Sequence, residues 1–151
     1  MLRKVLIATV AGIAAALSIS SFAQAQSGTA AEAKAMLERA VAAVKADKAK
    51  ALASFDKGDP AFKDRDLYPF CFQIADGINV AGPQSVRGKD VRTLKDPTGK
   101  SFGEDIYKAA QDEKFNEVPY MFPRPGETTP VAKVSFVTKV GDLGCGVGYY
   151  K

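Results

Sequence analysis

The sequence predicts an α+β domain in which a long N-terminal helix packs on an antiparallel sheet. Three observations lead to this fold class. An alanine-rich stretch repeats its apolar residues at helical spacing. Later stretches alternate as strands do, and glycine- and proline-containing turns separate them. The strands cluster after the helix instead of alternating with helices, which is the pattern of an α+β domain.

Residues 1–25 have the features of a secretory signal peptide. A short basic start precedes an apolar run at residues 5–19, and residues 22–25, Phe-Ala-Gln-Ala, offer a small-residue cleavage site. The run is shorter than the roughly 20 apolar residues of a membrane-spanning helix. We therefore predict cleavage after Ala25 and a single mature domain, residues 26–151, that is periplasmic or secreted.

Residues 30–56 predict one long helix. Thr29 and Glu32 have the spacing of a capping box at its start, and Gly58 followed by Pro60 supplies a stop. Apolar residues recur at three- and four-residue steps, at Leu37, Val41, Val44, Leu52 and Phe55. The helix would be about 40 Å long at 1.5 Å per residue. We favour packing along its own sheet, and a homodimer through this helix is the alternative.

Two strands and a short helix are predicted in the middle of the chain. Residues 68–75 alternate, and Asp76-Gly77 favours a two-residue hairpin turn into a second strand. Residues 82–100 are rich in turn signals. Ser101 and Glu104 then repeat the capping-box spacing, so a second, short helix is expected after them.

Three further strands are predicted at the C-terminal end. Pro119 makes the strand through Tyr120 and Phe122 an edge strand, because proline has no N–H to donate to a neighbour. Residues 131–140 and 143–150 form a hairpin across Gly141-Asp142.

The cysteine pair adds a constraint on the order of these strands. Cys71 and Cys145 fall in the mature part, and an exported chain with one such pair favours a disulfide over two buried thiols. The bridge would close a loop of about 74 residues, which the chain-entropy model values at roughly 4 kcal/mol. Because bridged Cα atoms lie within about 7 Å, the first and last strands would be neighbours.

Composition argues against several function classes. Without Arg3 and Lys4 the net charge falls from +4 to about +2, which is too small to favour nucleic acid or an anionic membrane. The chain has no histidine, the commonest general base and metal ligand. Its paired carboxylates, such as Asp64 with Asp66, lie in charged surface-like contexts. We predict no enzyme, no metal site and no cofactor; a hydrolase or lyase using these carboxylates is the rival hypothesis.

Residues 118–137 offer the residue types of a small-ligand site, although residue types alone favour an ordinary core. Tyr120 and Phe122 on an edge strand, a proline-stiffened turn with Arg124, and Lys133 on the return strand would place aromatic faces near cations. Apolar walls with a few polar groups are the usual design of a ligand cleft, and a carboxylate would find donors here. The alternative is that the aromatics fill the core and the two cations are solvated.

From Leu67 to Tyr150 the sequence resembles the single-Cache family of small bacterial extracytoplasmic sensor domains. The resemblance rests on LYPFCFQIADGINVAGP, VRGKDVRTLKDPTGKSF, VPYMFPRP and VAKVSFVTKVGDLGCGVGYY, in the family's order. It implies a long helix on a five-stranded antiparallel, PAS-like sheet with the first and last strands adjacent. It also implies a pocket for a small molecule, often a small organic acid.

The resemblance assigns roles to the candidate residues. Tyr120 looks like the family's pocket tyrosine and Lys133 like its pocket lysine, so Lys133 would pair with a ligand carboxylate. Phe122 and Phe136 stand where the family usually has tryptophan and tyrosine, and with Phe70 they would wall the ligand. The two phenylalanines remove two hydrogen bonds of about 0.5–1.5 kcal/mol each, so a more apolar pocket is expected.

The resemblance also suggests partners. The family usually sits outside a membrane receptor, a chemotaxis transducer or a histidine kinase, whereas this sequence stops at Lys151 after the last strand. We therefore predict a solitary periplasmic sensor that signals through a separate membrane partner, by closing residues 118–133 over the ligand and shifting the long helix. The alternative is an interaction module that uses the long helix and has a vestigial pocket.

Overall fold

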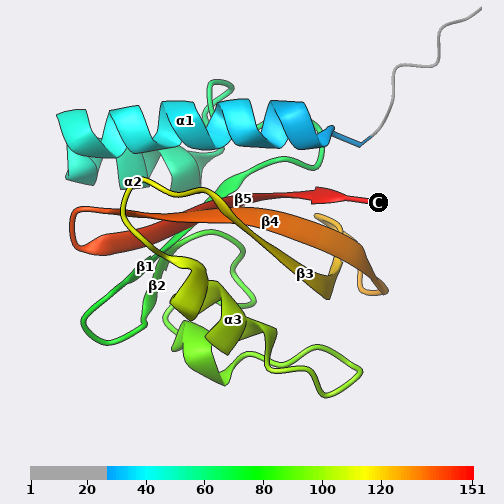
Figure 1. Cartoon of the computed structure of the whole chain (residues 1–151). Helices are drawn as coiled ribbons and strands as arrows, with labels where there is room; N and C mark the ends of the chain where they lie inside the picture. The colour runs from blue at the N-terminus through cyan, green and yellow to red at the C-terminus, as the bar shows by residue number, and fades with distance from the viewer. Residues whose placement is uncertain (1–26) are drawn as a thin grey trace, which may run out of the picture.

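The computed structural model describes residues 27–151, and the predicted signal peptide lies outside them. The domain has three layers (Figure 1). Helices α1 and α2 cover one face of a five-stranded antiparallel sheet, and α3 with its neighbouring loops lies against the other face. We call these the helix face and the cleft face. The predicted α+β class and five-stranded sheet are confirmed.

Helix α1 (Ala30–Ala46) begins at the predicted capping box. The hydroxyl of Thr29 accepts the N–H of Glu32 at 3.2 Å, and the Glu32 carboxylate accepts the N–H of Thr29 at 2.8 Å. Two backbone donors that the first helical turn leaves unpaired are thereby satisfied.

The range predicted as a single helix contains two helices, so that prediction was wrong. At Asp47 the backbone is extended, and its carboxylate accepts the N–H of Lys50, which starts α2 (Lys48–Lys57). An aspartate that caps a new N-terminus ends the first helix. Helix α2 then folds back beside α1 (Figure 1) and ends at Gly58, whose φ of 65° suits glycine.

The sheet has the strand order β2-β1-β5-β4-β3. Its strands are β1 (Pro69–Gln73), β2 (Asn79–Ala81), β3 (Asn116–Pro123), β4 (Pro130–Val140) and β5 (Leu143–Tyr150). Strand β3 is an edge strand, as its proline predicted. Cys71 on β1 lies opposite Cys145 on β5, and the two are disulfide-bonded. The predicted neighbourhood of the first and last strands is therefore confirmed.

Two turn and cap details differ from the prediction. The loop between β1 and β2 has four residues instead of two, because the Gln73 N–H bonds to the Ile78 carbonyl and encloses residues 74–77. Helix α3 (Phe102–Ala109) has Ser101 as its N-cap, but the serine side chain makes no capping bond. The Glu104 carboxylate instead pairs with Lys108 one turn further on, at 2.9 Å.

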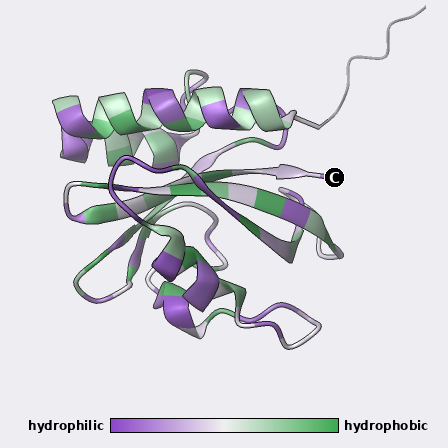
Figure 2. Ribbon diagram, in the orientation of Figure 1, coloured by the Kyte–Doolittle hydropathy of each residue, from purple (hydrophilic) through white to green (hydrophobic). Residues whose placement is uncertain are grey.

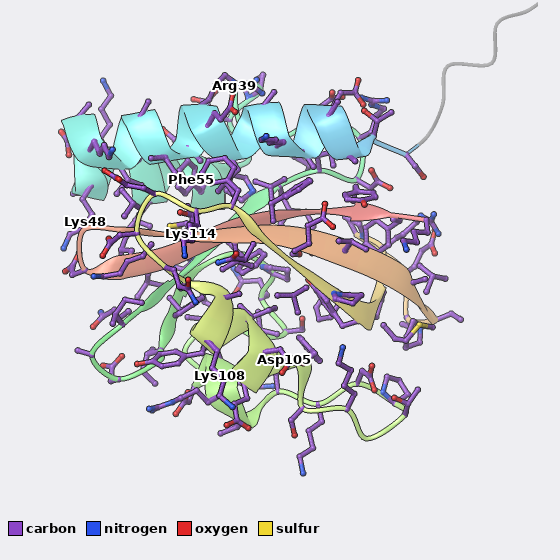
Figure 3. The ribbon with its side chains drawn as sticks, viewed as in Figure 1. Arg39, Lys48, Phe55, Asp105, Lys108 and Lys114 are labelled. Atoms are coloured by element: carbon purple, nitrogen blue, oxygen red, sulfur yellow. A yellow bond between two sulfur atoms is a disulfide. The ribbon has the colours of Figure 1, made fainter. Side chains whose placement is uncertain are left out.

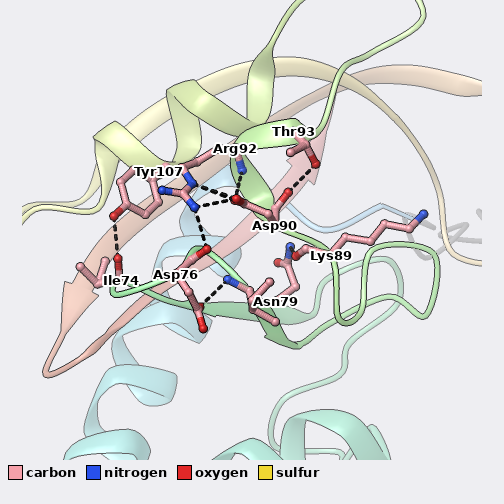
Figure 4. A network of polar contacts seen from close by, with 9 residues as sticks. Ile74, Asp76, Asn79, Lys89, Asp90, Arg92, Thr93 and Tyr107 are labelled. Atoms are coloured by element: carbon pink, nitrogen blue, oxygen red, sulfur yellow. Dashed lines mark hydrogen bonds and ion pairs between the residues drawn. The ribbon is translucent and has the colours of Figure 1, made fainter.

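A polar network ties α3 to the first hairpin (Figure 4). Arg92, in the short 3₁₀ helix η1 (Val91–Thr93), donates to both carboxylate oxygens of Asp90 and to the carbonyl of Asp76 at 2.7 Å. The Tyr107 hydroxyl donates to the Ile74 carbonyl at 2.6 Å. These contacts hold α3 and η1 against the first hairpin of the sheet.

The two faces of the sheet carry separate apolar clusters. The cluster on the helix face includes Met36 and Leu37 of α1, Phe55 of α2, and Phe136 of β4. The cluster on the cleft face includes Phe70, Phe102 and Tyr120. Figure 2 colours parts of α1 and of the sheet green, as apolar, whereas charged side chains such as Arg39 on α1 and Lys108 on α3 lie on the outside (Figure 3).

Candidate functional site

A row of three polar side chains crosses the cleft face of the sheet. The strand register places Tyr120 of β3 directly opposite Lys133 of β4, and Lys133 opposite Tyr150 of β5. Residues that are directly paired on neighbouring strands project to the same face, so the three side chains are neighbours. The fold therefore sets a lysine between two tyrosines in the middle of this face.

Lys133 is buried at 2% exposure. Its Nζ atom donates to the hydroxyl of Tyr68 at 2.9 Å and to that of Tyr150 at 3.3 Å. It also lies 4.4 Å from the ring centroid of Tyr68, 4.7 Å from that of Tyr150 and 5.3 Å from that of Phe122. Two phenol oxygens and three ring faces thus surround the ammonium group, and no carboxylate of residues 27–151 lies at hydrogen-bonding distance from it.

This burial changes the titration of the lysine. Loss of water around the ammonium lowers the pKa of Lys133 to about 7, and the nearby Asp66 carboxylate offsets only part of that effect. Burial also raises the pKa of Tyr150 to about 12 and raises those of Tyr68 and Tyr120. The phenols therefore stay neutral donors near pH 7, and an added anion would be the group that favours a charged lysine.

Arg124 and Asp66 form a charged pair beside the lysine. Arg124 Nε lies 3.6 Å from Asp66 Oδ2, and its guanidinium lies 4.9 Å from the ring centroid of Tyr150. Asp66 Oδ1 accepts the N–H of Gly28 at 2.7 Å, whereas the buried Oδ2 accepts no hydrogen bond within the described part of the chain. The distance from Nε to Oδ2 is an ionic contact too long for a good hydrogen bond.

A cleft of about 810 Å³ opens beside this cluster. Tyr68, Phe122 and Arg124 line it, together with the end of α2, the loop after β2, the loop before α3 and the turn between β3 and β4. A small hollow of about 30 Å³ continues toward α3 and shares Tyr68 and Phe122 with the cleft. Lys133 lines neither space, because the rings of Tyr68, Phe122 and Tyr150 cover its head.

Five of the six sequence-predicted ligand residues lie in this region. Arg124 and Phe122 line the cleft, Phe70 and Tyr120 line the hollow, and Lys133 lies behind the aromatic rings. The Tyr120 ring stacks on Phe102 with centroids 4.5 Å apart, and its hydroxyl bonds to Ser135 at 2.9 Å. As the structure stands, Tyr120 is held by the protein itself.

Phe136 lies apart from the other five predicted ligand residues. Its assignment as a wall of the pocket is therefore corrected. It lies three residues after Lys133 on one strand, so the alternation of side chains turns it to the helix face. There it packs in the cluster with α1, and its ring centroid lies 6.0 Å from that of Tyr149.

The sequence reading missed Tyr68, Tyr150 and Asp66. Tyr150 had a usable signal: a two-residue turn at Gly141-Asp142 pairs Val140 with Leu143, and counting outward pairs Lys133 with Tyr150. Tyr68 also had a usable signal: it lies two residues before Phe70 in the alternating stretch 68–75, so alternation turns both to one face. Asp66 lies in a charged segment before that stretch, and nothing there indicates that it turns inward.

Other site types find no support in the described part of the chain. Residues 27–151 contain no group of three or more potential metal ligands, and no helix among them is long and apolar enough to cross a membrane. The arrangement is suited to binding an anion beside apolar surface, because it offers two cations and neutral hydroxyls around a cleft.

Solved structures with the same fold belong to chemotaxis proteins. A methyl-accepting chemotaxis protein from Vibrio parahaemolyticus RIMD 2210633 aligns with a TM-score of 0.64 at 22% identity, over 80% of this chain and 86% of that chain. A periplasmic sensor domain of a chemotaxis protein aligns with a TM-score of 0.63 at 26% identity, over 80% and 93%. The fold is thus that of an extracytoplasmic sensor domain.

A third similar structure concerns carboxylic acid recognition by a Cache chemosensory domain, with a TM-score of 0.58 at 22% identity over 80% of this chain and 86% of that one. A search of curated proteins found no match. The single Cache domain 2 family matches residues 7–150, nearly the whole sequence. The chain belongs to this family of ligand-binding sensor domains, as the sequence resemblance indicated.

Proposed function

We propose that this domain is a periplasmic sensor for a small organic acid whose carboxylate pairs with Lys133 and Arg124. The observation that carries the proposal is the buried ammonium of Lys133, whose hydrogen-bond partners among residues 27–151 are phenol oxygens and include no carboxylate. A buried charge without a counter-ion is costly, and a ligand carboxylate would supply one. The similar structure that concerns carboxylic acid recognition supports the same ligand class.

Binding requires a local opening of the site. The hydroxyl of Tyr68 accepts from Lys133 Nζ where a ligand oxygen would do so, and the Tyr68 ring stands between the lysine and the cleft. Tyr68 is half-buried and lies outside the strands, so its movement breaks no backbone bond of the sheet. An entering carboxylate would displace its hydroxyl and take over the hydrogen bond.

A set of contacts leads from the site to the start of α1. Arg124 pairs with Asp66, and Asp66 holds the N–H of Gly28, two residues before α1 begins. A ligand carboxylate that draws Arg124 toward itself weakens the hold on Asp66 and on this end of α1. We infer that ligand closure of the turn around Arg124 is passed to α1 by this path, and from there to a membrane receptor or histidine kinase.

That the protein acts as a solitary domain with a separate membrane partner stays a prediction, as does cleavage after Ala25. The interaction-module alternative gains no specific support, because the outward face of α1 carries exposed charged side chains, among them Lys34, Glu38 and Arg39. We also propose binding without catalysis, in keeping with the chemosensory domains that share the fold.

The test is a thermal-shift and calorimetry screen of the purified protein against a panel of organic acids. An acid at 100 times its dissociation constant stabilises the fold by about 2.7 kcal/mol, which appears as a clear rise in melting temperature. Lys133→Met should abolish that rise. Lys139→Met is the matched control, because Lys139 lies on the same strand but pairs with Asp112 at the surface. A melting temperature that no acid changes would contradict the proposal.

A further inference from the structure

We propose that the ligand is a monocarboxylic acid with an apolar body of about five or more carbons, such as hexanoate or 3-phenylpropanoate. Its carboxylate would lie at the end of the cleft with Lys133 and Arg124, and its body would lie along the cleft. This inference rests on the proposed function and narrows its ligand class.

The size of the cleft indicates how large the ligand is. A space of about 810 Å³ falls within the range of sites that hold drug-sized ligands. At about 30 Å³ per water it has room for roughly 27 waters. Acetate has only four non-hydrogen atoms and would leave most of that space wet. An acid that fills the cleft must have a much larger body.

The side chains in the walls of the cleft indicate that the body of the ligand is apolar. Phe55 and Phe62, edge to face with ring centroids 4.8 Å apart, contribute from α2 and the segment after it. Phe102 and Phe122, with centroids 6.2 Å apart, contribute from α3 and β3. Phe62, Phe122 and Leu94 are only half-buried, so apolar surface along the cleft is left in contact with water. Covering that surface is favourable for an apolar body and not for a polar one.

The distribution of charge limits the acid to one carboxylate. Lys133 and Arg124 lie together beside the rings of Tyr68 and Tyr150. Arg65, which also lines the cleft, is already paired with Glu32 and Asp64. The lysines elsewhere on the rim, Lys57, Lys63 and Lys95, are exposed. Ion pairs with exposed lysines contribute little, because water and salt screen them. A second carboxylate on the body would therefore lose apolar contact and gain almost nothing in return.

The experiment measures dissociation constants by calorimetry for acetate, butyrate, hexanoate, 3-phenylpropanoate, adipate and hexan-1-ol. We expect affinity to rise two- to fourfold per methylene, the upper value corresponding to about 0.8 kcal/mol per buried CH₂. Hexanoate should then bind at least about 16-fold more tightly than acetate. Adipate, which replaces the terminal methyl of the chain with a carboxylate, should bind more weakly than hexanoate, and hexan-1-ol should not bind measurably.

A pair of variants tests whether the rise in affinity per methylene comes from contacts in the cleft. Leu94→Ala removes apolar wall and should reduce the gain in affinity per methylene. Leu52→Ala is the control, since Leu52 is also half-buried but packs on the helix-face cluster.

The outcomes separate the two proposals. Equal binding of acetate and hexanoate, or tighter binding of adipate, would overturn this inference and leave the organic-acid sensor standing. Binding of hexan-1-ol as tight as hexanoate would overturn the carboxylate contact in both. Absence of binding by every acid would overturn the proposed function and this inference with it.

Discussion

On strand β4, Phe136 turns to the helix face, whereas Lys133 and Ser135 turn to the cleft face. The helix face is covered by two helices along its length and has an apolar interior. The cleft face has one short helix, buried polar side chains and an open cleft. Alternate residues of the same strands therefore serve two purposes. One set packs on the helices and stabilises the fold, and the other places buried polar side chains, which cost stability, beside the cleft.

The two faces of the sheet should respond differently to substitution, because one is packed and the other holds a buried charge. A buried phenylalanine contributes through packing, which is lost when the ring is removed. A buried lysine contributes little to stability or opposes it, because its ammonium has lost water. Damage to the helix face should unfold the protein, and damage to the cleft face should leave a folded protein that no longer binds its ligand.

The largest expected effect is on the helix face. Phe136→Ala should reduce the free energy of unfolding by about 3–5 kcal/mol, because the ring is buried among α1 residues and leaves a cavity. Urea denaturation measures this loss, and acid affinity of the folded fraction should not change. If the variant kept its stability but lost acid binding, Phe136 would belong to the ligand site and the division of the two faces would be wrong.

The second effect is a pH dependence that arises on the cleft face. The pKa of Lys133 is lowered to about 7 in the folded state, so between pH 7 and 10 the unfolded chain binds more protons. Stability from this group should therefore rise as the pH increases from 7 to 9, by at most about 1.4 kcal/mol per pH unit. Above pH 10 the raised pKa values of the tyrosines act in the opposite direction.

Urea denaturation of wild type and Lys133→Met at pH 7, 8 and 9 checks this expectation. The difference in unfolding free energy between the two proteins should shrink or change sign in favour of wild type as the pH rises. A difference that stays constant across this range would show that the lysine titrates normally and is not buried.

The smallest effect compares two helix starts, one on each side of the sheet. Thr29→Ala should cost about 1 kcal/mol, because it removes the capping bond to the Glu32 N–H. Ser101→Ala should change stability by less than about 0.5 kcal/mol, because the Ser101 side chain makes no capping bond. Chemical denaturation of both variants measures the pair, and equal losses would mean that Ser101 also caps its helix.

Local patterns in the sequence predicted most of the fold, because those patterns act over short distances. The capping box at Thr29, the edge strand with Pro119 and the hairpin at Gly141-Asp142 all depend on neighbouring residues. The break at Asp47 was missed because helix propensity runs through it, and the spacing of apolar residues does not show a cap in mid-sequence.

The site was predicted less completely, because it depends on which way side chains face after the chain has folded. The pattern of neighbouring strands brought Tyr120, Phe122 and Lys133 together, and the family resemblance assigned them to a pocket. Phe136 was misplaced because strand alternation was not applied to its separation of three residues from Lys133. Tyr68 was overlooked although it shares the strand alternation of Phe70. Asp66 could not be found, since only the tertiary structure brings the segment before β1 against the end of β4.

The most direct test of the account is an NMR titration of the Lys133 side chain through its ¹³Cε resonance, with and without saturating hexanoate. Burial beside phenols predicts a pKa near 7 in the free protein, and pairing with a carboxylate predicts a clear upward shift in the complex. A pKa near 10.4, the value of a solvated lysine, in both states would contradict the claim that the cleft face holds a buried cation for a ligand acid.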